Sequence, residues 1–232
     1  MVDKDIGFIR LARLDDETEM LAIEKAASIK DARAFIVDLR DCPGGYLHSA
    51  FRLSALFVRD GLLGTIEFRQ PGDISNPSFG NARIQLSNGN FAEESASGSK
   101  PHILYLSTRL AANPCLSGKP IAVLINSHTS SGAELLAGIL RERAGAVLIG
   151  AKSFGKGTFQ STVPIGFDND LVITTGKFFL PSGYWLGDGA TDKRGLQPDR
   201  SVLPSSGKYV PGSTTDEDAA DAVEYLNLKL PK

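Results

Sequence analysis

The sequence has little cysteine, almost no net charge and no long apolar run. Its two cysteines, Cys42 and Cys115, are too few for the disulfide framework of a small secreted domain. The chain carries 25 basic and 27 acidic residues, a formal charge of −2, so a basic surface for nucleic acid is not expected. No apolar segment approaches the length of a membrane span. We therefore predict neither a nucleic-acid partner nor a membrane-spanning segment.

The N-terminus does not have the pattern of a signal peptide either. Met1-Val-Asp-Lys-Asp is charged, and no apolar stretch follows it. The sequence also has no internal repeat and no low-complexity tail. The 232 residues are 42% hydrophobic, which is enough for a well-formed core in one large domain or two small ones.

The chain alternates between apolar runs and amphipathic segments. In the first amphipathic segment, Met20, Ile23 and Ala27 have the spacing of a helix face that packs on a core. The order strand, helix, strand, helix at the N-terminus predicts a parallel or mixed sheet covered by helices. We expect helices at 15–30, 47–58 and 214–229, and one through Ala133, Leu136 and Leu140. We expect strands at 6–11, 34–39, 64–69, 121–125, 146–149, 158–163 and 171–179, and a hairpin at 82–95 around Asn88-Gly89.

Ser131 stands where an apolar strand and a loop of small residues lead into a helix. Ser131-Gly-Ala-Glu134 is a capping box, in which the serine oxygen and Glu134 satisfy free N–H groups at the helix start. The other interpretation makes Ser131 a nucleophile at a strand-to-helix turn, with the N–H of Gly132 free to face an oxyanion. The two interpretations compete for the same oxygen.

Lys156 lies between two glycines in the loop that follows the apolar run 146–149. The segment Gly150-Ala-Lys-Ser-Phe-Gly-Lys156 matches the first seven positions of a phosphate-binding loop. However, Gly157 stands where a serine or threonine should bind Mg²⁺, and the residues after it favour a strand where that motif requires a helix. Nucleotide binding is therefore the weaker interpretation of this segment.

Two other residues invite a catalytic interpretation. His128 lies three residues before Ser131, so its ring would need an unusual return to reach the serine oxygen, and no aspartate stands out as its partner. We expect it to pack in the loop or contact substrate. Cys42 has no histidine at a telling spacing and is expected to be structural. We expect His102 to be incidental.

Five motifs, in this order along the chain, resemble the core of the C-terminal processing peptidases, also called tail-specific proteases. The family's usual forms of the two central motifs are a Ser-Ala-Ser-Glu turn and a Phe-Gly-Lys-Gly-x-x-Gln loop. Ser131 and Lys156 are 25 positions apart, as in the family. The motifs extend over about residues 6–228 and comprise Asp38-Leu-Arg-Asp-Cys-Pro-Gly-Gly45, Ser131-Gly-Ala-Glu134, Phe154-Gly-Lys156-Gly-Thr-Phe-Gln160, Phe179-Leu-Pro-Ser-Gly183 and Gly195-Leu-Gln-Pro-Asp199.

The resemblance implies an α/β fold of the ClpP/crotonase-like class, with a mixed sheet, flanking helices and additional C-terminal strands. It implies a serine endopeptidase in which Ser131 is the nucleophile, Lys156 the general base and Gln160 the residue that orients the lysine. The lysine amine must be neutral for this role, so burial has to lower its pKa from the ordinary value of about 10.4. Activity should then rise with pH to a plateau.

The resemblance also implies an oxyanion hole made by the N–H of Gly132 and that of Gly44 or Gly45. The Pro43-Gly44-Gly45 turn follows the strand 34–39 at its C-terminal end, where α/β sheets usually build sites. As an alternative, the two glycines merely turn the chain. No cofactor and no metal is implied, and the partner is a polypeptide substrate, unfolded or C-terminal.

We predict one peptidase core domain over residues 1–232, with a surface insertion at about 70–118 that borders the cleft. No segment is large enough to be the PDZ domain by which most family members bind substrate C-termini, so specificity for C-termini stays open. The family works mostly outside the cytoplasm, so we expect a periplasmic or secreted location and a leader that has been removed. The main alternative function is a non-catalytic ligand- or peptide-binding module on the same fold. An acyl-CoA enzyme would need a CoA pocket that the sequence does not indicate.

Overall fold

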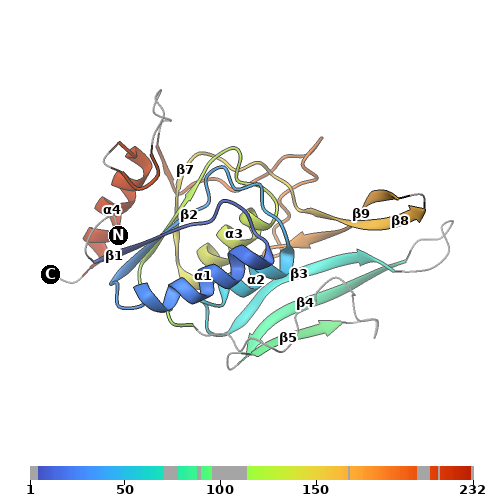
Figure 1. The fold of residues 1–232 in the computed structure, drawn as a ribbon, viewed down its shortest axis with the longest axis horizontal. Helices are drawn as coiled ribbons and strands as arrows, with labels where there is room; N and C mark the ends of the chain where they lie inside the picture. The colour runs from blue at the N-terminus through green and yellow to red at the C-terminus, as the bar shows by residue number, and fades with distance from the viewer. Residues whose placement is uncertain are drawn as a thin grey trace.

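The computed structural model describes residues 5–70, 78–87, 90–95, 114–166, 168–202, 210–213 and 215–230. Two sheets of five strands each lie on opposite sides of a group of helices (Figure 1). The first sheet is parallel, in the order β1-β2-β6-β7-β10, and the second is antiparallel, in the order β5-β4-β3-β9-β8. The predicted mixed sheet is therefore divided into a parallel and an antiparallel sheet.

The two sheets and the helices consist of the following elements. The parallel sheet consists of β1 (Ile6–Arg10), β2 (Ala34–Asp38), β6 (Ile121–Ile125), β7 (Val147–Gly150) and β10 (Arg200–Ser201). The antiparallel sheet consists of β3 (Gly61–Arg69), β4 (Phe79–Ser87), β5 (Asn90–Ser95), β8 (Thr158–Gly166) and β9 (Asn169–Phe179). The helices are α1 (Asp16–Ile29), α2 (Leu47–Ser54), α3 (Gly132–Ala144) and α4 (Glu217–Lys229).

The parallel sheet is covered on both faces, α4 lying on one and α1, α2 and α3 on the other (Figure 1). Because successive side chains of a strand point to opposite faces, each central strand supplies both layers. Ala34 and Ile36 of β2 belong to the cluster with α4, whereas Phe35 and Val37 belong to the larger core. This explains why these strands are nearly continuous apolar runs.

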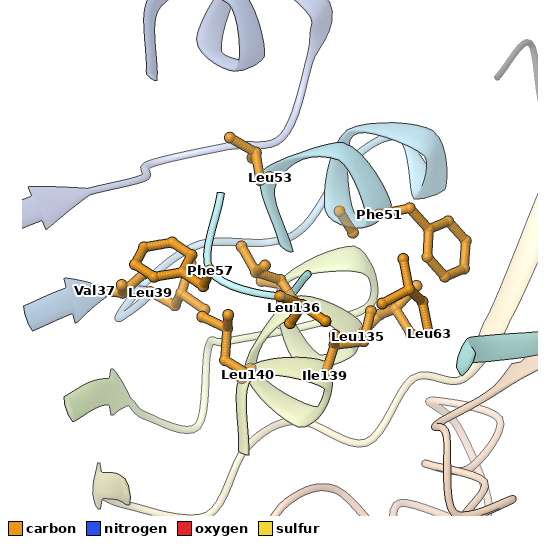
Figure 2. Close-up of a cluster of buried hydrophobic side chains, with 14 of the residues drawn as sticks. Val37, Leu39, Phe51, Leu53, Phe57, Leu63, Leu135, Leu136, Ile139 and Leu140 are labelled. Atoms are coloured by element: carbon orange, nitrogen blue, oxygen red, sulfur yellow. The ribbon is translucent and has the colours of Figure 1, made fainter. Parts of the chain in front are cut away.

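The larger core forms around α3. Its residues 132–140 are all buried, so the helix is enclosed between the two sheets. Figure 2 shows side chains from β2, α2 and β3 converging on those of α3. Enclosure fixes the start of α3, and with it the position of Ser131, which directly precedes the helix.

Most predicted elements are confirmed, and their ends differ by a few residues. The strand predicted at 121–125 coincides with β6. The helix predicted at 47–58 ends at Ser54, and residues 55–58 form a buried turn instead. The predicted hairpin is formed by β4 and β5, while its Asn88-Gly89 turn lies outside the described residues.

Of the predicted core face of α1, Ile23 packs partly buried against the larger core, but the prediction is wrong for Met20 and Ala27. Met20 and Ala27 are exposed, whereas Glu19 and Ala26 are buried. The reason is an ion pair between helices, because the Glu19 carboxylate lies 2.9 Å from the Arg52 guanidinium of α2. A buried carboxylate needs such a partner, and apolar periodicity does not reveal it.

The described part of the segment 70–118 is continuous with the domain. β4 pairs with β3, and Ala82, Ile84 and Leu86 are buried in the larger core. This strand therefore belongs to the core and is not a surface addition. Residues 71–77, 88–89 and 96–113 of the segment, which include His102, lie outside the described residues.

Candidate active site

Ser131, Lys156 and Gln160 line one open cleft of about 390 Å³. They come from three places in the fold. Ser131 directly precedes α3, Lys156 lies in the loop between β7 and β8, and Gln160 is in β8. The structure thus brings together the three side chains that the sequence predicts for the site. The remaining lining residues are Pro43, Gly45, Tyr46, Leu47, His48, Thr158 and Phe159.

Ser131 has an unusual backbone conformation, with φ +55° and ψ −121°. An ordinary N-cap residue is extended, and a non-glycine residue in this region costs about 1–3 kcal/mol. A sharp turn of this kind between a strand and a helix exposes a serine oxygen at the end of a sheet. The turn is packed so closely that a Cβ on Gly44 would lie 2.5 Å from the Ser130 carbonyl oxygen and 3.0 Å from Ser131 Cβ. Glycine at position 44 is therefore required beneath this turn.

The Glu134 carboxylate joins the serine turn to the lysine loop. It is fully buried and accepts hydrogen bonds from the N–H groups of Ser131 (2.9 Å), Gly155 (2.8 Å) and Lys156 (2.9 Å). The Ser153 hydroxyl donates to it as well. Burial raises the pKa of the Glu134 carboxyl above its ordinary value, and these hydrogen bonds oppose the rise. The glutamate half of the predicted capping box is therefore present, and the same carboxylate also holds the lysine loop.

Lys156 is half-buried, and its Nζ donates to Gln160 Oε1 at 3.1 Å. The amide nitrogen of Gln160 donates in turn to Thr174 Oγ1 of the neighbouring strand β9 at 3.3 Å. Because that nitrogen is engaged, the amide oxygen faces the lysine. The arrangement can hold an amine in one direction across the cleft.

The three candidate oxyanion glycines lie against one another beside Ser131. Gly132 is the first residue of α3, so its N–H has no partner within the helix. A Cβ on Gly132 would lie 3.6 Å from the nitrogen of Gly45, which lines the cleft. Burial raises the pKa of the Cys42 thiol to about 11, and a hydrogen bond from the Gly44 N–H reduces this rise. Of the three glycines, Gly45 lines the cleft with Ser131, and Gly132 lies directly beside Gly45.

His48 lines the cleft, and the sequence did not reveal it. Its Nε2 lies 2.7 Å from Asp16 Oδ1, and its ring stacks on Tyr46 with centroids 5.0 Å apart. The contact joins α1 to α2 over 32 positions, so no local motif could have indicated it. Within the described part of the chain, Asp16, Glu19 and His48 are the one group that could ligate a metal ion together. Glu19 is instead paired with Arg52.

The alternative residues do not join the cleft. His128 is exposed and absent from the cleft lining, although its Nδ1 lies 3.3 Å from Asp41, a partner that the sequence did not indicate. Cys42 is buried, as expected for a structural residue. Lys156 is followed by the strand β8, as predicted, so the helix of a phosphate-binding loop is missing at this position. No helix in the described ranges has both the length and the apolar character needed to cross a bilayer.

The model of peptidase family S41 matches residues 5–202. The chain is 29% identical to a carboxy-terminal-processing protease of Bartonella bacilliformis over 191 residues, which are 78% of this chain and 36% of that protein. It is 27% identical to the carboxy-terminal processing protease CtpA of Bacillus subtilis over 233 residues, which cover 99% of this chain and 42% of that protein. The chain thus spans less than half the length of these relatives.

A solved structure of a photosystem II D1 C-terminal processing protease superposes with a TM-score of 0.61 and 22% identity. The match covers 93% of this chain and 46% of the solved chain. At this identity the similarity shows the fold, which is the predicted α/β fold of the ClpP-like class. The chain therefore belongs to peptidase family S41, a family of serine-type peptidases that includes the C-terminal processing proteases.

Proposed function

We propose that this chain is the catalytic core of a serine endopeptidase that uses Ser131 and Lys156 as a dyad. The observation that carries the proposal is the shared cleft, in which Lys156 is held by a 3.1 Å hydrogen bond to Gln160 while Ser131 lines the same space. A serine hydroxyl is a weak nucleophile and needs an adjacent base. The cleft lining includes two basic side chains, Lys156 and His48. Because His48 Nε2 is engaged with Asp16, we assign the role of base to Lys156.

In the first step, Ser131 Oγ attacks the carbonyl carbon of the scissile peptide bond, and its proton passes to the neutral amine of Lys156. The N–H groups of Gly45 and Gly132 donate to the oxygen that becomes negative. The Gln160 amide oxygen accepts from the amine and keeps it directed into the cleft. The strained Ser131 turn and the Glu134 carboxylate fix the nucleophile before substrate binds.

In the second step, the tetrahedral intermediate collapses and the C–N bond breaks. Protonated Lys156 returns its proton to the leaving amine, which leaves an ester between Ser131 and the acyl part of the substrate. Lys156, neutral again, then takes a proton from water, and the hydroxide attacks the ester. When the ester C–O bond breaks, Lys156 returns this proton to the Ser131 oxygen and the acid product leaves.

The alternative of a binding module is less well supported. A carrier for small apolar ligands needs an apolar cavity, whereas Ser131, Lys156, Thr158 and Gln160 present polar groups to this cleft. No described feature of the cleft favours a second function.

For substrates, we propose unfolded polypeptides or C-terminal protein segments, in line with the names of the relatives. We further propose an extracytoplasmic location, periplasmic or secreted, and one peptidase domain over the whole chain, as the family resemblance implies.

The test is digestion of an unfolded protein by the wild type, Ser131→Ala and Lys156→Ala, with the products mapped by mass spectrometry. Ser127→Ala and Lys152→Ala are matched controls, because both residues are exposed and absent from the cleft lining. We expect cleavage by the wild type and both controls and none by the two site variants. Cleavage that survives Ser131→Ala would refute the assigned nucleophile.

A further inference from the structure

We propose that the loop 187–192 is a positioning element for Lys156 and that Gly189 sets the direction of the lysine side chain. The inference rests on the proposed function in one respect, namely that the amine of Lys156 acts as the base. The contact itself is independent of that role. Gly189 touches no reacting atom in this arrangement, so it is a positioning residue.

Gly189 packs directly on the stem of the lysine. A Cβ at position 189 would lie 3.0 Å from Lys156 Cγ, 3.1 Å from Lys156 Cβ and 3.4 Å from the Phe154 ring. The first two distances are shorter than the usual contact between carbon atoms, about 3.5–4.0 Å. The missing side chain of Gly189 therefore leaves the space in which the first part of the Lys156 side chain lies.

The loop is tied to the backbone on both sides of the contact. The Gly157 N–H donates to the Gly187 carbonyl oxygen at 2.7 Å. The backbones of Lys156 and Asp188 form an isolated antiparallel β-bridge. The Asp188 N–H donates to the Asp192 carbonyl oxygen at 2.8 Å, which closes the loop. A Cβ on Gly187 would lie 2.0 Å from the same oxygen, so only glycine permits this closure.

The Asp188 carboxylate holds the loop in one shape. It accepts hydrogen bonds from the N–H groups of Ala190 (2.7 Å), Thr191 (2.8 Å) and Asp192 (2.9 Å), and from the Thr191 hydroxyl. The Thr191 hydroxyl and these N–H groups hold the pKa of Asp188 well below its ordinary value. Asp188 thus stays ionised at every pH at which a lysine base could work, and the loop keeps its shape across that range.

The backbone of Lys156 cannot shift away from a methyl group added at position 189. Its N–H and that of Gly155 are bound to the buried Glu134 carboxylate, and Gly157 is bound to the loop itself. The side chain must instead rotate about its first bonds. Because Nζ lies three bonds beyond Cγ, a small rotation there moves the amine further and breaks its hydrogen bond to Gln160.

The experiment compares Gly189→Ala with Gly118→Ala. Both glycines have nearly the same left-handed backbone, φ +79° and +77°, but nothing lies within 4 Å of a Cβ at position 118. The two variants therefore carry similar backbone strain, and only the first meets the lysine. We would measure kcat and KM from pH 5 to 11. We would also measure the acetylation rate of Lys156 against pH by mass spectrometry, with exposed Lys25 as the internal reference.

We expect Gly189→Ala to lower kcat about ten- to hundredfold with little change in KM, since a displacement of about 1 Å can cost that much. The pH midpoints of kcat and of Lys156 acetylation should shift together, while Gly118→Ala behaves as the wild type. Equal midpoints in the two variants would overturn the inference. If Gly189→Ala does not fold, Asp188→Ala takes its place, and an unchanged acetylation profile of Lys156 in that variant would overturn it as well.

The two proposals can fail separately. In one outcome the wild type hydrolyses no peptide, and Gly189→Ala nevertheless shifts the acetylation profile of Lys156. The positioning role then holds and the peptidase mechanism fails. If the wild type hydrolyses peptides through Ser131 and Lys156 while Gly189→Ala changes neither profile, the mechanism holds and the positioning role is wrong.

Discussion

At the scale of single residues, the site depends on glycines and one buried carboxylate as much as on the reacting groups. Gly44, which has no side chain, permits the close approach of the Ser131 turn, and Gly45 brings a second backbone segment next to Gly132. Glu134 then binds the turn and the lysine loop to each other through three N–H groups. The relative position of Ser131 and Lys156 follows from these backbone contacts.

Replacement of Glu134 by glutamine tests this clamp. An amide has only one oxygen, so its NH₂ group would face N–H donors that the carboxylate now satisfies. A buried donor without an acceptor costs about 1–3 kcal/mol, and we expect a loss of stability of that size and at least tenfold lower activity. Urea unfolding and peptide hydrolysis measure the two effects. The control is Glu142→Gln, which changes an acid that binds exposed Ser182; equal losses in both variants would contradict the clamp.

Replacement of Gly45 by alanine tests the close approach beside the serine. A Cβ there would lie 1.9 Å from the Leu14 carbonyl oxygen, and φ of Gly45 is +145°. Gly61, with φ +114° and nothing within 4 Å, is the matched control. We expect Gly61→Ala to cost about 1–2 kcal/mol or less and Gly45→Ala to cost several times more, as measured by thermal unfolding. A similar cost for both would mean that the backbone at Gly45 can simply move aside.

At the scale of elements, a buried ion network fixes α4 to the end of β2. Arg40 is 2% exposed, and its guanidinium donates to Asp216 at 2.7 Å and to Asp38 at 2.8 Å. Asp216 is also the N-cap of α4, where it accepts from the Ala219 N–H. The same β2–turn segment leads into Gly44 and Gly45, so the network supports the position of the predicted oxyanion donors.

The variant Arg40→Met leaves the buried Asp216 carboxylate without its cationic partner and leaves Asp38 with Arg10 alone, and breaking a buried pair in this way typically costs about 3–5 kcal/mol. Burial alone would raise the pKa of Asp216, but its hydrogen bonds, chiefly from Arg40, lower it below 3.8. A carboxyl with a lowered folded-state pKa stabilises the protein above its unfolded value, and this contribution is lost as pH falls through the folded value. The stability difference between wild type and variant should therefore be largest near neutral pH and shrink below about pH 4. Urea unfolding at several pH values checks this, and a constant difference would contradict it.

The elements that the sequence predicted well are those whose pattern is local. The predictions of β2, β6 and α3 are confirmed. A buried strand or helix has a characteristic pattern of apolar residues, and this pattern is visible within a few neighbouring positions. The face that α1 buries, with Glu19 inside and Met20 outside, was not predictable in this way. It depends on Glu19 and Arg52, 33 positions apart, whose pairing exists only once the two helices have packed.

The site divides in the same way. Ser131, Lys156 and Gln160 could be predicted to share one place because they stand in motifs that resemble a known family, and they line one cleft. His48 and Gly189 could not, since each reaches the site through a contact between loops or helices distant in sequence. Nothing in the composition of the polar loop 187–192 indicates that it packs against a lysine.

At the scale of the whole molecule, both sheets share one core around α3. We therefore expect the chain to unfold as one unit, in agreement with the prediction of a single domain. Trp185 fluorescence, which reports on the loop beside Gly157, and far-UV circular dichroism should give coincident urea transitions. Two separate transitions would mean that the sheets belong to units that unfold independently.

The central claim is that Lys156 activates Ser131, and covalent labelling of the serine tests it most directly. The wild type, Ser131→Ala and Lys156→Ala would be treated with a fluorophosphonate between pH 5 and 10, and the modified peptide identified by mass spectrometry. We predict an adduct on Ser131 that forms faster as pH rises, and at least a hundredfold slower labelling in Lys156→Ala. An adduct on another residue, or the same rate and pH dependence without Lys156, would contradict the account.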